Sequence, residues 1–248
     1  MRFENTEVFN FEGAIHGMRN PKNSWSKSDS HYSCGNLECD NNNEERCATC
    51  FAYNYDEQNY YTIGKKDMKL AQTLIKAGSE HRKFMRQIFV SVDITAPLYW
   101  WKEFDTYKVG TTANSTSTMH KLATTPITLE CFETDDYRSK ITQDIETGFN
   151  LSGEEIIINF CEDLRQKYLE TKDKKYWKEL IRWLPESWLQ KRTVTMTYEN
   201  LLAMCGRGQR RFHKLNEWSG QDNQDLPNFI SWARTLPYAQ ELIFIDEL

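Results

Sequence analysis

The stretch that decides the fold runs from Gly78 to Lys121 and reads GSEHRKFMRQIFVSVDITAPLYWWKEFDTYKVGTTANSTSTMHK. It begins with the pair Glu80-His81 and continues into the β-rich run Phe89–Val92, which we expect to end as a strand at Asp93. An aromatic, helix-compatible segment over 96–104 follows, with a proline in its first turn. Its concentration of chemically versatile residues makes this stretch the candidate functional centre of the chain.

Small hydroxyl side chains fill the end of this stretch. Residues 111–118 are Thr, Ala, Asn and Ser, which are poor material for a helix or a core. We expect Thr112, Asn114, Ser115 and Ser117 to line a polar pocket or to turn the chain, because they offer several donors and acceptors over a short span. An exposed polar loop without a role is the alternative.

The Glu-His pair and the Trp pair each have two interpretations. Glu80 and His81 could position a ligand or form an acid–base pair, or they could end the preceding helix at the surface. Trp100 and Trp101 are expected in the core, although indole rings also stack on a flavin or a base.

Apolar periodicity predicts the elements outside this stretch. A helix is expected over Asp67–Ala77, with Asp67 as its cap. Further helices are predicted over 154–169, 176–184, 201–218 and 229–235, and further strands over 8–15 and 193–197. The chain has no internal repeat and no low-complexity linker, so we expect a single domain over 1–248.

A polar insertion with a hairpin is expected at about 26–59. It contains four of the 7 cysteines, and only the last two have good zinc-ligand spacing. We expect reduced cysteines in a variable loop and no metal site, while a zinc-binding scaffold built around the insertion stays the alternative. These cysteines are Cys34, Cys39, Cys47 and Cys50.

Three arginines within five residues form the strongest local charge feature. Arg207, Arg210 and Arg211 lie in a chain whose net charge is −5. A guanidinium binds phosphate through two parallel donors, so this segment is a candidate anion site, with a solvated helix face as the alternative.

Composition excludes several classes of protein. The acidic balance argues against general nucleic-acid binding. No stretch approaches the roughly 18 apolar residues of a membrane span, and the polar start lacks a signal peptide, so we expect a cytoplasmic protein without a membrane partner. The sequence also lacks the GxGxxG, P-loop, GxSxG and HExxH motifs.

Taken in order, these pieces resemble the flavin-dependent thymidylate synthases. That family has a Glu-His pair after a helix, a strand, a helix with the signature RHRx7S, and later a Leu-Pro, a strand, and an Arg-bearing helix with AQ-x-E. The resemblance covers roughly residues 63–248, with few identities. The matching segments are Glu80-His81, Phe89–Val92, Leu184-Pro185, Thr193–Thr197, Glu199–Leu202, Arg207–Glu217 and Leu236-Pro237. Residues 17–30 further suggest a phage or gut-bacterial subgroup.

The signature itself is the main departure from the family pattern. Counting from the Glu-His pair places Phe104-Asp105-Thr106 at RHR, and counting back from Ser117 places Tyr107-Lys108-Val109 there. Neither register restores an arginine. In the family these basic residues hold the flavin and help to polarise the uracil, so their replacement bears directly on catalysis.

The resemblance implies an α+β fold, with a twisted antiparallel sheet flanked by helices, in a homotetramer that binds FAD, dUMP, methylenetetrahydrofolate and NADPH. Under it, Ser117 and Asn114 approach the base as catalytic candidates, and the three arginines bind the nucleotide phosphate. The candidates for the flavin are His81, Lys108, Asn200 and His213.

The sequence therefore predicts a flavin-dependent enzyme that methylates or otherwise modifies the base of a pyrimidine nucleotide. The alternative is a catalytically inactive protein on the same fold that binds or sequesters the nucleotide.

Overall fold

The computed structural model describes residues 1–33, 60–134, 152–206 and 209–248. The chain divides into two compact units, each assembled from three separate stretches. Unit 1 comprises Met1–Glu7, Ser91–Met196 and Gly208–Thr235, and unit 2 comprises Val8–Val90, Thr197–Arg207 and Leu236–Leu248.

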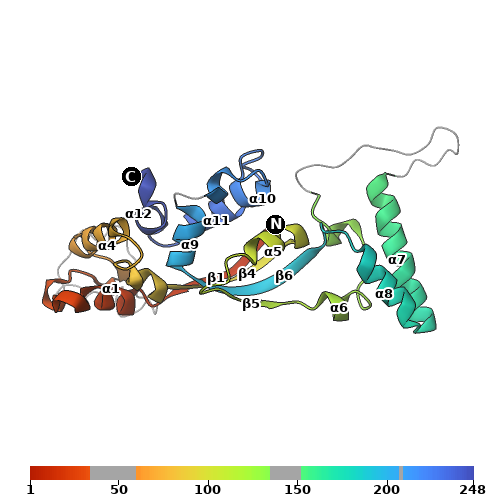
Figure 1. Ribbon diagram of the computed structural model, residues 1–248, viewed down its shortest axis with the longest axis horizontal. Coiled ribbons are helices and arrows are strands. Elements are labelled where there is room, and N and C mark those ends of the chain that lie inside the picture. Colours follow the sequence, from red (N-terminus) through yellow and green to blue (C-terminus); the bar gives the residue numbers. More distant parts are fainter. Residues whose placement is uncertain (34–59, 135–151, 207–208) are drawn as a thin grey trace, which may run out of the picture. The chain divides into compact units, whose positions relative to one another are not determined.

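A four-stranded antiparallel sheet confirms the predicted α+β class (Figure 1). Its strand order is β1-β4-β6-β5, with β1 over Arg2–Phe9, β4 over Phe89–Pro97, β6 over Leu189–Thr197 and β5 over Thr112–Ser115. Alternation sets the two faces of β4, because the even-numbered positions from Val90 to Ala96 are all fully buried. The strand extends past the predicted end at Asp93, since Ile94 and Ala96 continue the same buried row.

The hydroxyl-rich segment forms the edge strand β5. It pairs antiparallel with β6, and Asn114 lies opposite Thr193 while Ser115 lies opposite Arg192. All four residues of β5 are exposed. Short polar strands are suited to a sheet edge, since they discourage pairing with other chains.

Strand β1 contains a local irregularity at Asn5, whose φ is 51°. Phe3 stacks on Trp232, with ring centroids 5.1 Å apart, and the Trp232 indole N–H also donates to Thr6 Oγ1 at 3.1 Å. Strict alternation would put residues three apart on opposite faces, so the left-handed backbone of Asn5 brings Phe3 and Thr6 to the same ring. The Asn5 side chain donates instead to Asp93 at 2.9 Å.

An aromatic core packs around α5 (Leu98–Phe104) in unit 1. Trp100 stacks on Trp218 of α10 (Asn216–Ser219) at 4.6 Å and on Phe104 at 5.2 Å. Phe229 of α11 (Phe229–Arg234) closes the cluster 5.0 Å from Trp218. The Trp101 N–H donates to the Gln190 carbonyl at 2.9 Å. Both tryptophans of the pair are fully buried, which confirms their expected place in the core.

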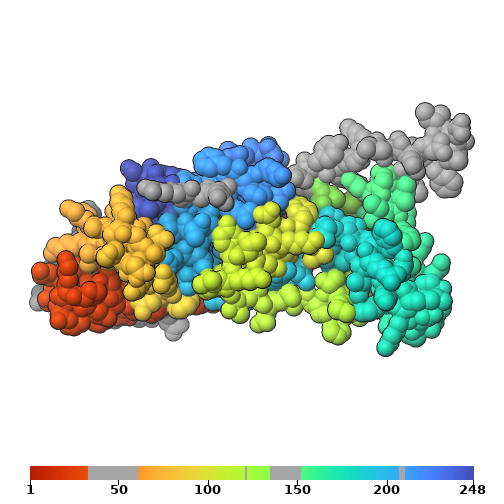
Figure 2. Space-filling model, in the orientation of Figure 1, coloured from red at the N-terminus to blue at the C-terminus, as the bar shows by residue number. Residues whose placement is uncertain are grey.

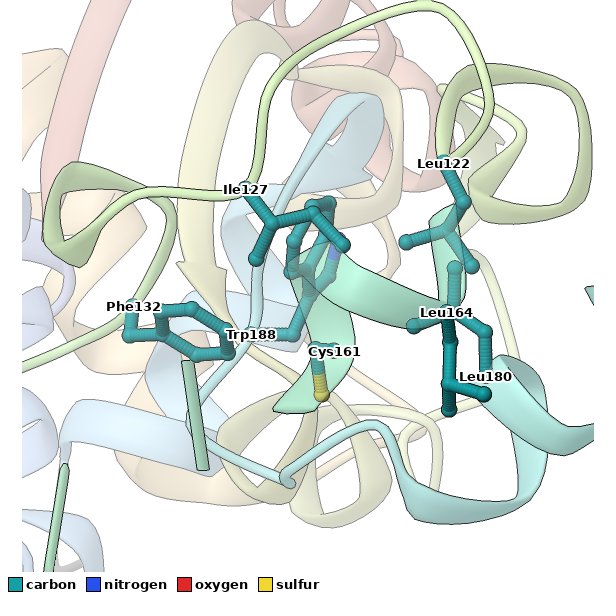
Figure 3. Packing of buried hydrophobic residues seen from close by; sticks show 7 residues of the cluster. All are labelled: Leu122, Ile127, Phe132, Cys161, Leu164, Leu180 and Trp188. Atoms are coloured by element: carbon teal, nitrogen blue, oxygen red, sulfur yellow. The ribbon is translucent and has the colours of Figure 1, made fainter. Parts of the chain in front are cut away.

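A second apolar cluster of unit 1 holds the helical hairpin of α7 (Gly153–Thr171) and α8 (Lys174–Trp183), which lie side by side (Figures 1 and 2). Figure 3 shows Cys161 and Leu164 of α7 and Leu180 of α8 in one cluster with Leu122, Ile127 and Phe132. These three come from the segment that follows α6 (Thr118–Lys121) and includes the one-turn helix η4 (Leu129–Cys131). Helix α7 begins with a capping box, in which Ser152 and Glu155 each accept the other's backbone N–H. The predicted helices over 154–169 and 176–184 are thus confirmed.

Unit 2 contains α1 (Phe11–Arg19), α4 (Lys65–Ala77), α9 (Tyr198–Cys205) and α12 (Ala239–Leu242). The short helices η1 (Asn20–Lys22), η2 (Trp25–Lys27), η3 (Lys83–Gln87) and η6 (Ile245–Glu247) join them, together with the two-stranded pair of β2 (His31–Ser33) and β3 (Tyr60–Thr62). Strand β3 lies just beyond the insertion predicted at about 26–59, and residues 34–59 of that insertion lie outside the described ranges.

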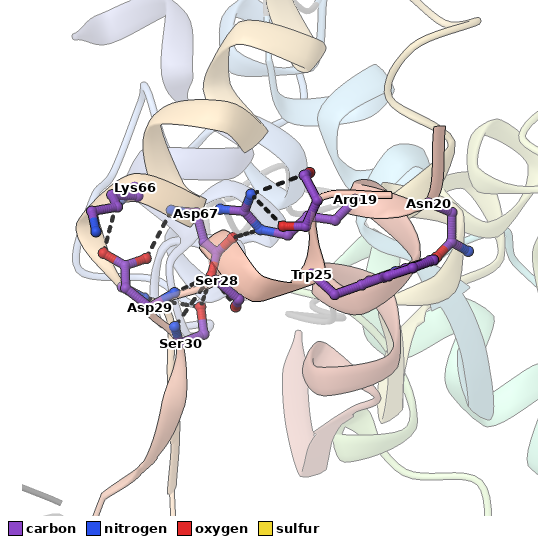
Figure 4. A network of polar contacts seen from close by, with 10 residues as sticks. Arg19, Asn20, Trp25, Ser28, Asp29, Ser30, Lys66 and Asp67 are labelled. Carbon is purple, nitrogen blue, oxygen red and sulfur yellow. Dashed lines mark hydrogen bonds and ion pairs between the residues drawn. The ribbon is translucent and has the colours of Figure 1, made fainter. Parts of the chain in front are cut away.

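A buried carboxylate organises unit 2 (Figure 4). Asp67, which is fully buried, accepts from Arg19 Nε at 2.5 Å, from Ser28 Oγ at 2.6 Å, and from both the backbone N–H and the hydroxyl of Ser30. Burial opposes ionisation, but the bonds from Ser28, Ser30 and Arg19 hold the pKa of Asp67 below its ordinary value. The predicted role of Asp67 as a helix cap is therefore wrong, since Gly64 holds that position.

Two further elements differ from their predictions. The segment 8–15 is mostly helix, because Phe11, Ala14, Ile15 and Met18 are buried at helical spacing. The predicted helix over 201–218 is broken after Cys205 into α9, the one-turn helix η5 (Gln209–Phe212) and α10. A side chain at Gly206 would collide with the Leu202 carbonyl, so the close approach requires glycine and the helix ends there.

Candidate functional site

The arginine-rich segment and the segment at the signature position meet in unit 1. Arg210 donates from Nε to the Tyr107 hydroxyl at 2.9 Å and from Nη1 to Glu103 at 2.5 Å. Its guanidinium also lies over the rings of Trp218 and Tyr107, at 4.6 Å and 5.3 Å from their centroids. Hydrogen bonds and cation–π contacts together fix this cation in one place.

The charges of this cluster depend on one another. The hydrogen bond from Arg210 is the main reason that the pKa of Glu103 lies below its ordinary value. Burial opposes the charge on Arg210, but its bonds with Glu103 and Tyr107 raise the pKa of the guanidinium. Arg210 and Glu103 are therefore both ionised at neutral pH.

His213 lies beside the same carboxylate, with Nε2 3.6 Å from Glu103. Burial lowers the pKa of this imidazole, and the nearby Arg210 cation lowers it further. The ring is therefore neutral at pH 7, so that one nitrogen donates and the other accepts. His213 Nδ1 lies 3.1 Å from the Leu215 backbone N–H, which donates to it, so the proton belongs on Nε2.

The wall behind this cluster is formed by α5 and α10. Tyr99 of α5 donates through its hydroxyl to Glu217 of α10, which is buried. Trp218 follows Glu217 directly and carries the Arg210 guanidinium on its ring. Helix α5 therefore positions the arginine segment in two ways. Its Tyr99 binds Glu217, and its Glu103 binds Arg210.

Three of the remaining candidates of unit 1 lie at its surface, and the fourth, Arg211, is half-buried. Lys108 is exposed in the loop after α5. Asn114 is exposed on the edge strand, and Ser117 caps α6 by accepting from the His120 backbone N–H at 3.3 Å. Ser117 Oγ is also 2.8 Å from His120 Nδ1.

Two flavin candidates, His81 and Asn200, belong to unit 2. Residues next to them in sequence form hydrogen bonds with one another. His81 is exposed in the turn after α4, and Asn200 is in the first turn of α9. Arg82 and Arg86 both donate to Glu199, the Arg82 bond being 3.1 Å long, so the Glu-His turn adjoins the start of α9. Asn200 forms a capping box with Thr197, which gives it a structural role.

Several predicted residues fall outside the described ranges, namely Arg207 and the cysteines at 34, 39, 47 and 50. Within the described ranges, no group of His, Cys, Asp and Glu side chains has the arrangement of a metal site. No helix among the described residues is long and apolar enough to cross a membrane.

Sequence reasoning missed Glu103, Tyr107 and Trp218 as members of the cluster. Tyr107 occupies the signature position in one of the two registers, so its place in the chain was a usable signal. The pairing of Glu103 with Arg210 joins residues 107 positions apart. A single sequence carries no mark of that contact.

Two solved structures share the fold of this protein along nearly its whole chain. The flavin-dependent thymidylate synthase ThyX from Helicobacter pylori, in complex with FAD and dUMP, aligns with 99% of this chain and 99% of its own, at a TM-score of 0.57 and 16% sequence identity. A second structure with FAD and dUMP gives a TM-score of 0.58 at 16% identity, covering 99% and 98% of the two chains.

A third structure, the UMP/dUMP methylase PolB from Streptomyces cacaoi bound with 5-Br dUMP, aligns over 72% of this chain and 80% of its own, at 13% identity and a TM-score of 0.47, which is too low to establish a shared fold. No protein-family model matches the sequence, and no curated protein sequence does. The chain has the fold of the flavin-dependent thymidylate synthases, and this bears out the fold that the ordered motifs imply.

Proposed function

We propose that this protein is a flavin-dependent, thymidylate-synthase-like enzyme that acts on the base of a pyrimidine nucleotide, by methylation of dUMP or a related modification. The observation that supports it most is the place of Arg210 beside Tyr107, on a fold shared along nearly the whole chain with an FAD- and dUMP-bound synthase. The signature lacks both arginines, and a guanidinium from the later segment lies against the same position.

Each member of the cluster has a role in this proposal. Arg210 and Arg211 remain the proposed contacts to the nucleotide phosphate, and Arg210, which lies beside Tyr107, is also proposed to polarise a carbonyl oxygen of the pyrimidine ring. Glu103 is the positioning residue that orients the guanidinium. His213 is uncharged, so it can donate a hydrogen bond to the base without adding a second cation.

FAD is the proposed cofactor, and the described residues fit it in chemistry. Lys108 is an exposed cation suited to the pyrophosphate of the cofactor. When bound, the flavin would supply the hydride. We assign methylenetetrahydrofolate and NADPH as the further reactants, and a homotetramer as the assembly, from the same likeness. Asn114 and Ser117 remain the proposed contacts to the base.

We also keep the single domain and a phage or gut-bacterial origin as proposals. Both units are discontinuous in sequence, which supports one folding domain because neither unit corresponds to an uninterrupted stretch of the chain.

The test is to purify the protein, record its absorbance between 350 and 500 nm, the region in which oxidised flavins absorb, and then titrate it with FAD and with dUMP by calorimetry. We expect flavin to bind, dUMP to bind, and Arg210→Lys to weaken dUMP binding, with Arg182→Lys on the exposed face of α8 as the control. Absence of flavin absorbance together with no binding of added FAD would refute the proposal. Tight dUMP binding without any flavin would identify an inactive nucleotide-binding protein.

A further inference from the structure

Unit 2 contains a cavity of about 650 Å³ that none of the proposed chemistry uses. It is lined by the end of β1, the start of α1, the β2–β3 pair and residues 237 and 238. This volume is within the range of small-molecule sites. The side chains that define it are Phe9, Phe11, Glu12, Tyr32, Tyr61 and Tyr238.

Five of the ten described lining residues are aromatic, and four of these rings meet in two nearly perpendicular pairs. Tyr32 and Tyr61 are 5.3 Å apart at 71°, and Phe11 and Tyr238 are 5.5 Å apart at 78°. In such a pair the edge of one ring meets the face of the other. Tyr32 and Phe9 are also unusually open for large side chains, with 44% and 42% of their surfaces exposed.

The cavity lining has one acidic side chain and no basic one among its described residues. Glu12 is the one side chain of the Asp, Glu, Lys, Arg and His types in its described lining. The Tyr32 hydroxyl donates to Glu12 Oε2 at 2.8 Å, which fixes the carboxylate against the aromatic wall. Arg19 lines a smaller adjoining cavity of about 290 Å³, but Asp67 neutralises it.

The wall is held in an unfavourable backbone conformation. Asn10 and Tyr238 both line the cavity, and both have left-handed backbones, with φ of 71° and 54°. Such a conformation is costly for an aromatic residue. Contacts of the Tyr238 hydroxyl hold the ring in place, since it accepts from the Ile63 N–H at 3.0 Å and donates to the Tyr61 carbonyl at 3.2 Å.

We propose that this cavity binds an organic cation of the alkylammonium class. The electron-rich faces of the aromatic rings attract a cation, and the single carboxylate supplies the counter-charge. A neutral aromatic ligand could stack on the same rings, but it would leave Glu12 without a partner of opposite charge. The same carboxylate would repel an anionic ligand.

The experiment compares choline with its neutral isostere 3,3-dimethylbutan-1-ol, which has the same shape and lacks the charge. Binding of each to the full chain is measured by titration, following the methyl resonance of the probe by NMR. We expect choline to bind saturably and at least tenfold more tightly than the alcohol. Glu12→Gln should weaken choline binding about tenfold and leave the alcohol unchanged.

Two variants of Tyr32 distinguish the contribution of its ring from that of its hydroxyl. A third variant, at a surface carboxylate, controls for a general effect of charge. Tyr32→Leu should weaken choline binding severalfold, whereas Tyr32→Phe should keep it within threefold because the ring remains. Glu170→Gln, on the exposed side of α7, is the matched control and should have no effect. Equal affinity for the two probes would show a neutral ligand site and overturn the proposal. So would choline binding that Glu12→Gln leaves unchanged, or no saturable binding of choline to the wild-type chain.

Discussion

Replacing Glu162 by Gln should destabilise the packing of α7 against residues 123–127. Glu162 accepts two bonds from Arg165, at 2.7 and 2.5 Å, and one from the Ile127 backbone N–H at 2.8 Å. Arg165 itself also donates to the Ala123 carbonyl at 3.3 Å. The pair therefore joins α7 to residues 123–127, at the edge of the cluster drawn in Figure 3.

The magnitude follows from the burial of Arg165 and from the pKa of Glu162. Arg165 is 5% exposed, so the variant leaves a nearly buried cation without its counter-charge. The Arg165 bonds are the main cause that lowers the pKa of Glu162 from 4.5 to about 2. That difference corresponds to about 3 kcal/mol of stability at neutral pH, and partial exposure of the carboxylate reduces the expected loss to about 2 kcal/mol.

The control is the same substitution in a pair of the same spacing. Glu179 and Arg182 on α8 are also three residues apart and bonded at 3.0 Å, but the side chains are 37% and 59% exposed. Glu179→Gln should destabilise the protein much less than Glu162→Gln does, because exposed ion pairs contribute little. Urea unfolding of both variants and the wild type, followed by circular dichroism, gives the comparison.

The pH dependence supplies a second readout. The pKa of Glu162 is lower in the folded protein, so its contribution is complete above pH 4.5 and is lost as the pH falls through about 2. The difference between wild type and Glu162→Gln should therefore shrink from pH 5 towards pH 2. Equal losses for the two variants at pH 7, or a difference that does not change with pH, would refute the reasoning.

Three other predictions follow from the described contacts. Asp67→Asn should destabilise the protein by about 3–5 kcal/mol because Arg19 stays buried without its partner, and a loss below 1 kcal/mol in urea unfolding would contradict this. Gly206→Ala should cost about 1–3 kcal/mol through the steric conflict at the end of α9, whereas Gly153→Ala, where a Cβ meets nothing within 4 Å, should be neutral or stabilising; thermal unfolding distinguishes them. Arg210→Leu should weaken dUMP binding more than Arg210→Lys, because the lysine keeps the charge and loses the fork, and equal affinities by calorimetry would argue against a role for the charge.

Much of the fold could be predicted from the sequence where one local pattern decided the outcome. The helices over 154–169 and 67–77 have clear apolar stripes, and both are present as α7 and α4. The prediction failed at Asp67, where a residue type that favours helix caps is used to neutralise Arg19, 48 positions away. Long-range electrostatics overrode the local preference there.

The sequence indicates which segments form the candidate site, but it does not indicate which side chains in them contact one another. The segments 104–109 and 207–213 could be found by their order along the chain. What each side chain contacts could not be predicted, because Arg210 is fixed by Glu103 and Tyr107, more than 100 positions earlier, and by Trp218. The break after Cys205 was missed for a similar reason, since periodicity alone does not show how closely Gly206 approaches other parts of the backbone.

The hydrogen bonds of the Tyr238 hydroxyl with Tyr61 and Ile63, at the end of the β2–β3 pair, have a consequence for the order of folding during synthesis. Unit 2 takes its first stretch from the beginning of the chain and its last from residues 236–248, and Tyr238 joins the two through bonds to residues about 175 positions earlier. A ribosome exposes those partners long before residue 238 emerges. The β2–β3 pair therefore waits, incompletely packed, until translation of this region is over, and contacts of such long sequence separation form slowly.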